Sequence, residues 1–412
     1  MNILIKNIPD TYNYGSMMMA ENIITYLNKR LNKNINYYTE AFTPSDIERL
    51  INATGYNEIY KDDIFSYNLI TKKIKYVRYI ERSIRKKLKM KKACNFYDVI
   101  IVLGGDDFAE TYYKIPKDNI EIKRLFNELQ YFNKNTKLFM IGQTIGPYTG
   151  ERINMAKKGF EDIKIYSRDD LTAKYMKETF DLDINISRDL AFLDLHLQNE
   201  YVNDKVNILK KHNLKEDEYI VIVGTHLLNK YSKEEKDVIK SFYHLIKELK
   251  KKYKDKKIVW LSHVLTPNRS NDNTLYNLIN ETYDNYLKKE CISIIEPILP
   301  VEARIILGNG IFTITCRMHA AVSTLQMKRP AISLSYSNKY RGVIAEGLNL
   351  EDLVIDAKND LLWDKKIIKL ILEKCDYVLK NYDVIVDRID TNVIKSQKKI
   401  KETLEEIIES LD

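Results

Sequence analysis

The sequence predicts an α/β protein made of two doubly wound domains that face each other across a cleft. Short apolar runs alternate with longer segments in which apolar residues recur at helical spacing, a pattern typical of parallel sheets covered by helices. Several runs are continuously apolar, as expected of strands that are buried on both faces of a sheet. The 412 residues suffice for two or three domains of about 150 residues each.

The predicted strands fall into two groups along the chain. The first group lies at residues 3–8, 97–103, 137–141 and 164–166. The second group lies at residues 219–223, 257–262, 292–295, 311–315 and 331–335. Helical spacing of apolar residues predicts helices between them, for example at 233–252 and 366–380.

A polar stretch at residues 198–218 separates the two groups and places a domain boundary near residue 205. We therefore expect an N-terminal domain over 1–204, a C-terminal domain over 205–385 and a charged amphipathic helix over 386–412. In doubly wound sheets, ligands bind at the carboxyl ends of the strands. The loops that follow the predicted strands are therefore the expected place of a functional site.

The balance of charge favours some partners over others. Lys and Arg outnumber Asp and Glu by 66 to 58, which gives a net charge of +8. This excess is too small to predict a nucleic-acid partner, but it favours anionic ligands or an anionic membrane surface.

Several classes of protein are excluded by missing motifs. The four cysteines stand singly, so we expect neither a zinc site nor a disulfide framework, and a reducing compartment fits. The pattern of a signal peptide and that of a membrane-spanning helix are both missing, which predicts a cytoplasmic protein that is soluble or bound to a membrane surface. No GxGxxG, Walker or GxSxG motif is present. The zinc-binding motif HExxH is also missing, so we expect no metal site.

The segment from Lys72 to Lys92 is distinctive because it carries eleven Lys and Arg residues against one acid, Glu81. Its apolar residues recur at steps of three or four and define one face of a helix: Ile74, Val77, Ile80, Ile84 and Leu88. Such a helix either is an ordinary domain helix with a basic outer face or lies on an anionic membrane.

The strongest candidate block runs from Thr313 to Ala320, where a strand ends and a helix is expected to begin near Ala320. Arg317 and His319 then lie at the carboxyl edge of a sheet beside a helix N-terminus, a place that binds anions. Arg317 can bind a carboxylate or phosphate through two hydrogen bonds, and His319 can exchange protons near neutral pH. A structural interpretation stays open, in which His319 caps the helix and Arg317 pairs with a surface acid.

A similar block, Ser167-Arg168-Asp169-Asp170, ends a strand of the first group. Ser167 or Asp169 can cap the helix that follows, and Arg168 then lies at the carboxyl edge of the first sheet. Arg168 and Arg317 together predict a clamp on one dianion across the cleft. The tripeptide recurs as Ser187-Arg188-Asp189, but the helix after Asp170 favours Arg168.

Two glycine-containing loops also follow strands. The loop at 104–107 reads Gly-Gly-Asp-Asp, and the loop at 142–147 reads Gly-Gln-Thr-Ile-Gly-Pro. The glycines permit a close approach of backbone to ligand, and Asp106 or Asp107 could orient or deprotonate a hydroxyl group. His226 and His263 follow strands of the second group, and His226 is more typical of a structural histidine.

The order of these blocks resembles that of the polysaccharide pyruvyl transferase family, from about residue 7 to residue 350. The resemblance rests on motifs in the family order: Asn13-Tyr14-Gly15-Ser16, Gly104-Gly105, the loop at 142–147, Ser167-Arg168-Asp169 with Asp189-Leu190-Ala191-Phe192, Ser262-His263 with Asn271-Asp272, Arg317-Met318-His319-Ala320, and residues 330–339 with Gly347-Leu348.

The resemblance implies two Rossmann-like domains of the GT-B kind. It also implies transfer of a pyruvyl group, without a cofactor or metal, from phosphoenolpyruvate to a sugar, where it forms a ketal. The acceptor would be a glycan of a cell-surface polysaccharide or its lipid-linked precursor, and the basic segment from Lys72 to Lys92 would then serve a membrane contact.

The resemblance also suggests roles for single residues. The donor would be bound by Arg168, Arg317, Lys339 and His263. His319 would act as the general acid, and Asp106 or Asp107 would activate the acceptor hydroxyl. The acceptor would be contacted by Asn13, Gly15, Gly105 and Gln143.

Two other functions stay open at this level. One is a GT-B glycosyltransferase that uses a nucleotide sugar, for which Glu346 before Gly347 could bind a ribose. The other is a glycan-binding relative without catalysis, against which the joint presence of Arg168, Arg317 and His319 argues.

Overall fold

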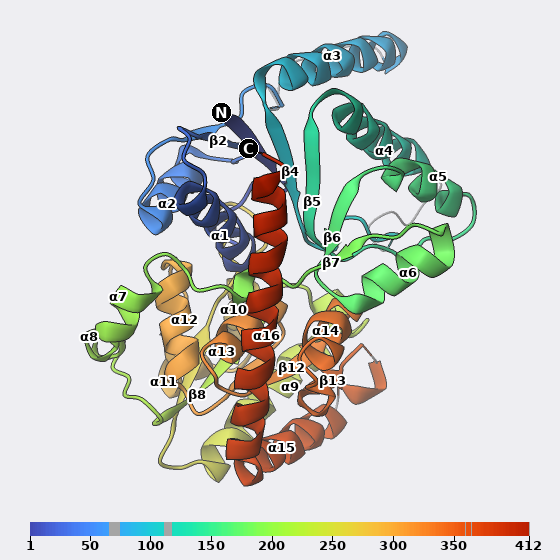
Figure 1. The fold of residues 1–412 in the computed structure, drawn as a ribbon. Helices are drawn as coiled ribbons and strands as arrows, with labels where there is room; N and C mark the ends of the chain where they lie inside the picture. Colours follow the sequence, from blue (N-terminus) through green and yellow to red (C-terminus); the bar gives the residue numbers. More distant parts are fainter. Residues whose placement is uncertain (66–74, 111–117, 359, 364, 412) are drawn as a thin grey trace. The chain divides into compact units, whose positions relative to one another are not determined.

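The computed structural model of the protein describes residues 1–65, 75–110, 118–358, 360–363 and 365–411. They form two compact units, each built around one parallel sheet (Figure 1). Unit 1 comprises Met1–Asp10, Ile23–Ser187 and Thr403–Asp412, and unit 2 comprises Thr11–Asn22 and Arg188–Glu402. The boundary expected near residue 205 therefore lies within unit 2, and the expected separate helix at 386–412 is divided between the units.

The sheet of unit 1 has the strand order β3-β2-β1-β4-β5-β6-β7, and all its described pairs are parallel. Its strands are β1 (Asn2–Lys6), β2 (Asn36–Thr39), β3 (Ile59–Lys61), β4 (Val99–Leu103), β5 (Lys137–Gln143), β6 (Lys164–Ser167) and β7 (Asn185–Ile186). The helices are α1 (Tyr14–Arg30), which begins in unit 2, α2 (Pro44–Thr54), α3 (Lys75–Phe96), α4 (Asp118–Asn135), α5 (Glu151–Phe160) and α6 (Asp170–Phe180).

The sheet of unit 2 has the order β10-β9-β8-β11-β12-β13 and is also parallel. Its strands are β8 (Tyr219–Val223), β9 (Lys257–Leu261), β10 (Ile292–Ile294), β11 (Thr313–Thr315), β12 (Ala331–Ser335) and β13 (Val354–Asp356). The helices are η2 (Leu190–Phe192), α7 (Gln198–Asn203), α8 (Lys205–Lys211), η3 (Leu228–Lys230), α9 (Glu235–Lys252), α10 (Asn273–Thr282), α11 (Tyr286–Glu290), α12 (Pro300–Asn309), α13 (Met318–Gln326), α14 (Asn338–Tyr340), η4 (Arg341–Glu346), η5 (Glu351–Leu353), η6 (Asp360–Leu362), α15 (Lys365–Lys380) and α16 (Tyr382–Glu409), which ends in unit 1.

The predicted α/β architecture with two doubly wound sheets is confirmed. The strands expected at 219–223 and 331–335 coincide with β8 and β12, and the other predicted strands differ from observed ones only at their ends. Four short strands were not predicted: β2, β3, β7 and β13. They have two to four residues each and lack the continuous apolar run that marks a buried central strand.

Both sheets reverse their strand order at one place. In unit 1, β1 lies between β2 and β4, and in unit 2, β8 lies between β9 and β11. The chain winds outward in one direction from the first strand of each sheet and then in the other direction. Such a switch point leaves a crevice at the carboxyl ends of the two central strands, where doubly wound proteins bind their ligands.

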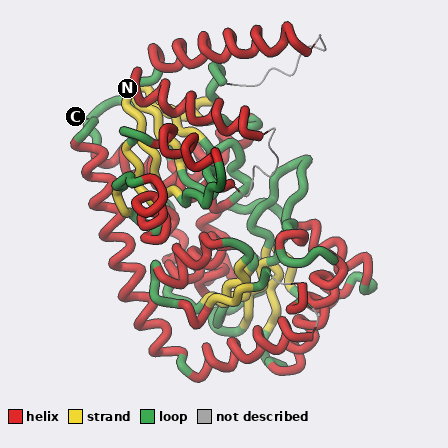
Figure 2. The backbone as a smooth tube through the Cα atoms, turned by 90° about the vertical axis from the view of Figure 1, so that its right-hand side faces the viewer, coloured by secondary structure: helices red, strands yellow, loops and turns green. Residues whose placement is uncertain are grey.

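Helices cover the sheets, and the apolar cores lie between helices and strands (Figure 2). In unit 1 the strand residues Leu4, Ile100 and Met140 join one core cluster with Phe126 of α4 and Phe160 of α5. Each of these side chains is at most 4% exposed. Burial of one such side chain contributes about 1.5 to 3 kcal/mol to stability.

Local sequence explains where two helices of unit 1 begin. The Asp169 side chain accepts a hydrogen bond from Thr172 N at 2.7 Å, so Asp169 is the N-cap of α6, one of the two caps that the sequence predicts. Thr43 caps α2 with a reciprocal pair of hydrogen bonds to Asp46, and Pro44 follows at the first helical position.

The loops after β4 and β5 approach each other so closely that Gly104 must be a glycine. A Cβ atom at Gly104 would lie 1.8 Å from the backbone oxygen of Gly142. Gly142 itself has φ +74°, a conformation that other residues rarely adopt. These two glycines bring the two loops together at the carboxyl edge of the sheet in unit 1.

None of the helices that the structure describes is both long and apolar enough to cross a membrane.

A buried arginine connects α12 of unit 2 to the segment around η2. Arg304 is fully buried, and its guanidinium donates to the carbonyl oxygens of Ala191 (2.6 Å) and Leu193 (2.9 Å) and to Gln198 Oε1 (2.8 Å). Burial lowers the pKa of Arg304 to about 10, so the group stays charged at neutral pH. The charge of Glu21 partly offsets this effect of burial.

We expect Arg304→Ala to destabilise unit 2 by about 3 to 5 kcal/mol, because the substitution leaves buried acceptors without their charged donor. Thermal and urea unfolding followed by circular dichroism would measure the loss. Lys240→Ala on the exposed face of α9 is the matched control and should unfold like the unmodified protein. An Arg304→Ala protein as stable as the control would contradict a structural role of this side chain.

Candidate active site

The best candidate site lies at the carboxyl edge of the sheet in unit 2, beside its switch point. His226 follows β8, His263 follows β9, and Arg317 follows β11. These three strands are neighbours in the order β9-β8-β11, so the loops that follow them meet at one edge. The site thus has the position that parallel sheets use for ligands.

The Asp272 carboxylate joins these three loops. It is fully buried and accepts hydrogen bonds from the backbone N–H groups of His226 (3.3 Å), His263 (3.3 Å) and Val264 (2.9 Å). The Arg317 guanidinium binds both carboxylate oxygens through Nε, at 3.1 and 3.2 Å, and also donates to Oδ1 through Nη2. Each loop is therefore held to the same anion.

The charges of Asp272 and Arg317 stabilise each other. Burial alone would raise the pKa of Asp272, but the Arg317 charge and the hydrogen bonds that Arg317 donates lower it to about 2. Burial would likewise lower the pKa of Arg317, yet the Asp272 carboxylate outweighs burial and raises it above the ordinary value. Arg317 therefore pairs with a buried acid, not with the surface acid of the structural interpretation.

The contact between Arg317 and His226 identifies the tautomer of His226. Arg317 Nη2 lies 2.8 Å from His226 Nδ1, and a guanidinium can only donate. Nδ1 of His226 also lies 3.4 Å from Asp272 Oδ1, but the contact with Arg317 is the shorter one. Nδ1 is therefore the acceptor, and the hydrogen of a neutral ring lies on Nε2. The side chains of His226 and Arg317 are 19% and 13% exposed, so both reach the surface of the site.

His319 lies two positions beyond Arg317, inside the helix and not before it. The structure begins α13 at Met318, two residues earlier than the sequence predicts. The Nε2 atom of His319 lies 3.2 Å from Oδ2 of the fully buried Asp189. The other side of the ring packs on Gly15, where a Cβ atom would lie 2.1 Å from His319 Nδ1. A glycine at position 15 is what permits this contact.

His263, which the resemblance assigns to donor binding, is an interior residue. It is 2% exposed, and its ring makes an edge contact with Tyr14 at a centroid distance of 5.1 Å. Burial and the charge of His319 lower the pKa of His263 to about 3. The ring is therefore neutral at physiological pH, and its role in donor binding stays a prediction.

Lys339 adds a cation from α14. Its Nζ donates to the Tyr336 hydroxyl at 2.9 Å and lies 4.9 Å from the centre of that ring. Tyr336 also interacts electrostatically with Arg317. Lys339, Tyr336 and Arg317 therefore belong to the same cationic region of unit 2.

Two residues expected on the acceptor side are part of unit 2. Asn13 forms an isolated antiparallel bridge with Val264, in the loop after β9, and Gly15 contacts His319. Both lie in Thr11–Asn22, which the structure assigns to unit 2 and not to an N-terminal domain. The structure thus places Asn13 and Gly15 in a different unit from Gly105 and Gln143, and their contact with an acceptor stays a prediction.

The remaining predicted residues form a second polar cluster at the carboxyl edge of unit 1. Arg168 is 1% exposed and donates through Nε to Thr144 Oγ1 at 2.8 Å. Thr144 in turn donates to Asp169 Oδ2 at 3.0 Å. Because Arg168 belongs to unit 1 and Arg317 to unit 2, the predicted two-arginine clamp stays a prediction.

Gln143 and the acidic loop complete this second cluster. The Gln143 side chain is fully buried and donates to the Val102 carbonyl at 2.8 Å, which directs its amide group to the sheet. Gly105 accepts a hydrogen bond from Thr144 N through its backbone oxygen. Asp106 and Asp107 lie in the loop after β4, where Asp107 is exposed. Their role as a base stays a prediction.

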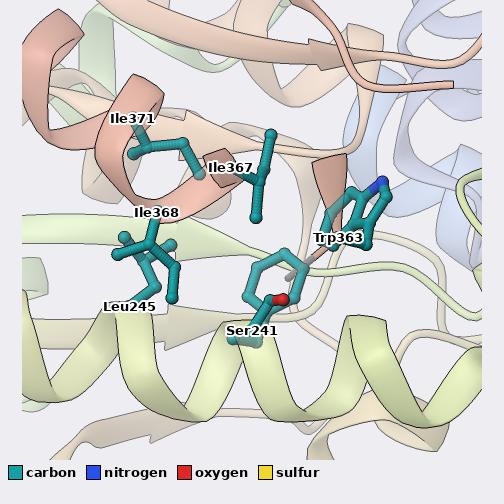
Figure 3. A pocket seen from close by; sticks show the side chains of 7 residues that line it. Ser241, Leu245, Trp363, Ile367, Ile368 and Ile371 are labelled. Carbon is teal, nitrogen blue, oxygen red and sulfur yellow. The ribbon is translucent and has the colours of Figure 1, made fainter. Parts of the chain in front are cut away.

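An apolar hollow between α9 and α15 is unsuited to this chemistry. Figure 3 shows its lining, which is apolar except for one hydroxyl group: Ser241, Phe242, Leu245, Trp363, Ile367, Ile368 and Ile371. None of the residues of the two polar clusters lines it. The hollow belongs to the packing of two helices in unit 2.

The roles of Asp272 and Asp189, the two carboxylates on which the site depends, were not predicted from the sequence. Both belong to motifs of the family resemblance, but those motifs assign them no role. Asp189 lies 130 positions from His319, and Asp272 lies 45 positions from Arg317, so no local spacing connects them. The one signal in the sequence is that Asp189 closes the repeated Ser-Arg-Asp tripeptide.

Comparisons with known proteins place this geometry in context. The family model described as "Polysaccharide pyruvyl transferase" matches residues 13–338 of the chain, which include every site residue of unit 2 except Lys339. No curated protein sequence matches the chain.

Solved structures with a similar fold include two UDP-GlcNAc 2-epimerases and one domain of a trehalose-6-phosphate phosphatase. A UDP-GlcNAc 2-epimerase from Neisseria meningitidis, bound to UDP-GlcNAc, is 13% identical, with a TM-score of 0.63 over 100% of this chain and 99% of that chain. A putative UDP-N-acetylglucosamine 2-epimerase from Listeria monocytogenes is also 13% identical, with a TM-score of 0.60 over 100% and 96%. The N-terminal domain of trehalose-6-phosphate phosphatase from Candida albicans is 12% identical, with a TM-score of 0.54 over 99% and 96%. At these identities the similarity concerns the fold alone, and it confirms the predicted GT-B-like pair of Rossmann-like domains.

We expect the stability that Asp272 contributes to depend on pH. Its folded pKa of about 2 lies below 3.8, the ordinary pKa of an aspartate, so the contribution is complete above pH 4 and is lost as the pH falls towards 2. The shift corresponds to about 2 kcal/mol. Melting temperatures of the unmodified protein and Asp272→Asn should therefore differ most at neutral pH and converge between pH 4 and pH 2.

The matched control is Asp237→Asn on α9, where the carboxylate is half-exposed and shows no such contacts with the site. Its melting temperature should follow that of the unmodified protein at every pH. A difference for Asp272→Asn that stays constant down to pH 2 would show that the carboxylate charge is not what holds the loops.

Proposed function

The chain belongs to the polysaccharide pyruvyl transferase family, and on that premise we propose that it transfers a pyruvyl group from phosphoenolpyruvate to a sugar. The acceptor is a glycan of a cell-surface polysaccharide or its lipid-linked precursor, and the product is a cyclic ketal. The observation that carries this proposal is that Arg317 and His319 follow β11 and Lys339 follows the neighbouring β12 at the carboxyl edge of unit 2, within a chain whose matched region spans residues 13–338.

The cationic region suits a donor that carries both a phosphate and a carboxylate. Arg317 uses Nε and Nη2 for Asp272 and His226, and its Nη1 makes no hydrogen bond with a described residue. In the proposed complex, Nη1 of Arg317, Nε2–H of His226 and Nζ of Lys339 donate to the anionic groups of phosphoenolpyruvate. Charge-assisted hydrogen bonds of this kind are about twice as strong as neutral ones.

His319 supplies the proton that starts the reaction. The imidazolium protonates the methylene carbon of phosphoenolpyruvate, which becomes the methyl group and leaves oxocarbenium character at the neighbouring carbon. A sugar hydroxyl adds to that carbon and gives up its proton. The bond from carbon to the phosphate oxygen then breaks, and a second hydroxyl closes the ring while its proton leaves with phosphate. One enol phosphate and two hydroxyl groups thus give one ketal and one inorganic phosphate.

A nucleotide-sugar glycosyltransferase is the second candidate, because the similar Neisseria epimerase binds UDP-GlcNAc. One contact argues against it. Glu346, the residue expected to bind a ribose, already accepts a hydrogen bond from Arg341 Nε at 2.7 Å. A thermal-shift screen separates the candidates: phosphoenolpyruvate stabilises a pyruvyl transferase, whereas nucleoside diphosphates stabilise the glycosyltransferase.

We expect phosphoenolpyruvate to bind the purified protein in isothermal titration and Lys339→Ala to weaken that binding by roughly 10-fold or more, because one charge-assisted bond is lost. Lys339→Ala leaves the Arg317–Asp272 pair intact, whereas Arg317→Ala should abolish binding but also leaves Asp272 unpaired. Unchanged affinity in Lys339→Ala would remove this side chain from the donor site.

Arg341→Ala is the control for this titration. Arg341 follows Lys339 by two positions, is exposed and pairs with Glu346, so its loss should leave the affinity for phosphoenolpyruvate unchanged. If the unmodified protein binds UDP or CMP and not phosphoenolpyruvate, the glycosyltransferase candidate replaces the proposed function.

A contact between the basic segment and an anionic membrane is a second part of the proposal. Residues 72–74 of this segment lie outside the described residues, and α3 is described from Lys75 onward. On its C-terminal half, Lys87, Lys91 and Lys92 are exposed, and Leu88 is 62% exposed among them. Lys86 instead pairs with Glu128 at 2.7 Å. The exposed cations and the exposed Leu88 suit the surface of a membrane that holds a lipid-linked acceptor.

We expect the triple substitution Lys87→Gln, Lys91→Gln and Lys92→Gln to weaken binding to vesicles of phosphatidylserine and phosphatidylcholine by roughly 100-fold, because each basic residue near such a surface contributes about 1 kcal/mol. Co-sedimentation with vesicles measures the change.

The control is a triple substitution of exposed lysines on α9, namely Lys236, Lys240 and Lys251, each to Gln. It changes the net charge equally and should leave vesicle binding unchanged. An equal loss in both triple variants would show that only net charge attracts the vesicles, which would contradict a local contact through α3.

A further inference from the structure

We propose that Asp189 is the positioning residue for His319. Its carboxylate holds the proton of His319 on Nε2 and thereby makes Nδ1 the nitrogen that exchanges a proton with the ligand. The inference rests on the proposed function, in which His319 is the general acid. It starts from the contact of His319 Nε2 with Asp189 Oδ2 at 3.2 Å, in which the carboxylate is fully buried.

The Asp189 carboxylate is itself held in place. Its Oδ1 accepts a hydrogen bond from Ala191 N at 3.0 Å, which makes Asp189 the N-cap of η2. The first oxygen therefore binds the backbone, and the second faces the imidazole. With both oxygens oriented, an acceptor-only carboxylate requires a donor on His319 Nε2.

The opposite side of the ring is set by the first turn of α1. A Cβ atom at Gly15 would lie 2.1 Å from His319 Nδ1 and 2.5 Å from Cγ, so only a glycine at this position leaves room for the ring. Asn22 of the same helix donates to the Leu190 carbonyl of η2 at 2.8 Å. The two elements that contact the ring, α1 and η2, are thus joined to each other, and the imidazole lies between them.

Asp189 supplies the negative charge that is in direct contact with the ring. His263 is neutral, because burial lowers its pKa to about 3, and it adds no positive charge. The Arg317 charge is balanced by Asp272, and Arg304 interacts with Asp189 and Asp194 as well as with Glu21. A negative carboxylate in hydrogen-bond contact stabilises an imidazolium and orients it, as in other histidine–carboxylate pairs.

A purely structural role of Asp189 leads to a different expectation. In that case Asp189 would serve only as the N-cap that fixes the start of η2 at Leu190. Asp189→Asn keeps an oxygen that can accept from Ala191 N, so the cap survives the substitution. It replaces the carboxylate oxygen at His319 with a neutral amide, which no longer selects a hydrogen on Nε2.

The experiment compares the unmodified protein with Asp189→Asn by nitrogen-15 NMR of the histidine side chains. The sequence has six histidines, and the spectrum of His319→Gln identifies the signals of His319 by their loss. In the unmodified protein we expect the neutral ring of His319 to carry its hydrogen on Nε2. In Asp189→Asn we expect the hydrogen to move to Nδ1 or to distribute between both nitrogens. An unchanged tautomer in Asp189→Asn overturns the inference.

Kinetics provide the second readout. With the tautomer lost, kcat for pyruvyl transfer should fall by roughly 100-fold or more, whereas KM for phosphoenolpyruvate should stay within about 2-fold, because the donor-binding cations are untouched. A rise of KM with unchanged kcat would assign Asp189 to donor binding and contradict the proposed role.

Asp194→Asn is the matched control. Asp194 lies five positions further along, and its carboxylate accepts from Gln326 Nε2 at 2.6 Å and not from His319. This variant should keep both the tautomer of His319 and kcat. The tautomer measurement needs no substrate, so its failure refutes the role of Asp189 alone. A normal kcat in His319→Gln would instead refute the acid assigned in the proposed function.

Discussion

The carboxylate of Asp272 holds the loops at the carboxyl edge of unit 2 in one arrangement. A fully buried anion needs hydrogen bonds and an opposite charge, and here both come from loops that follow three neighbouring strands. Because the same anion binds Arg317, the guanidinium is oriented before any ligand arrives. The cost of burying the carboxylate is offset by contacts that also place His226 and Arg317 at the surface of the site.

Three histidines at this edge differ in state because their surroundings differ. His226 is a neutral acceptor towards Arg317 and keeps its hydrogen on Nε2. His263 is neutral because burial opposes its charge. His319 contacts the Asp189 carboxylate through Nε2. One residue type thus makes three different contacts at this edge: with a guanidinium, with an aromatic ring and with a carboxylate.

Much of the scaffold followed from the sequence. A continuous apolar run marked β8 to the residue, because central strands of a parallel sheet are buried on both faces. The predicted bounds of β12 were also correct. The polar residues after those strands were recognised as site candidates, since the carboxyl edge of such a sheet is known in advance. The short strands β2 and β7 were not predicted from the sequence. Their pairing depends on the strands beside them in the sheet and not on their own apolar residues.

The sequence by itself determined that the chain alternates strands and helices, and that Arg317 and His319 follow a strand, because hydrophobic period and motif order are local properties. The tertiary structure alone decided that Gly15 of unit 2 contacts His319, and that Asp272 and Asp189 are the partners of Arg317 and His319. These pairs are separated by 45 to 304 positions, so they form only when the folded chain brings distant segments together. Which carboxylate pairs with Arg317 or His319 depends on its position in the folded protein, and that position cannot be predicted from spacing along the chain.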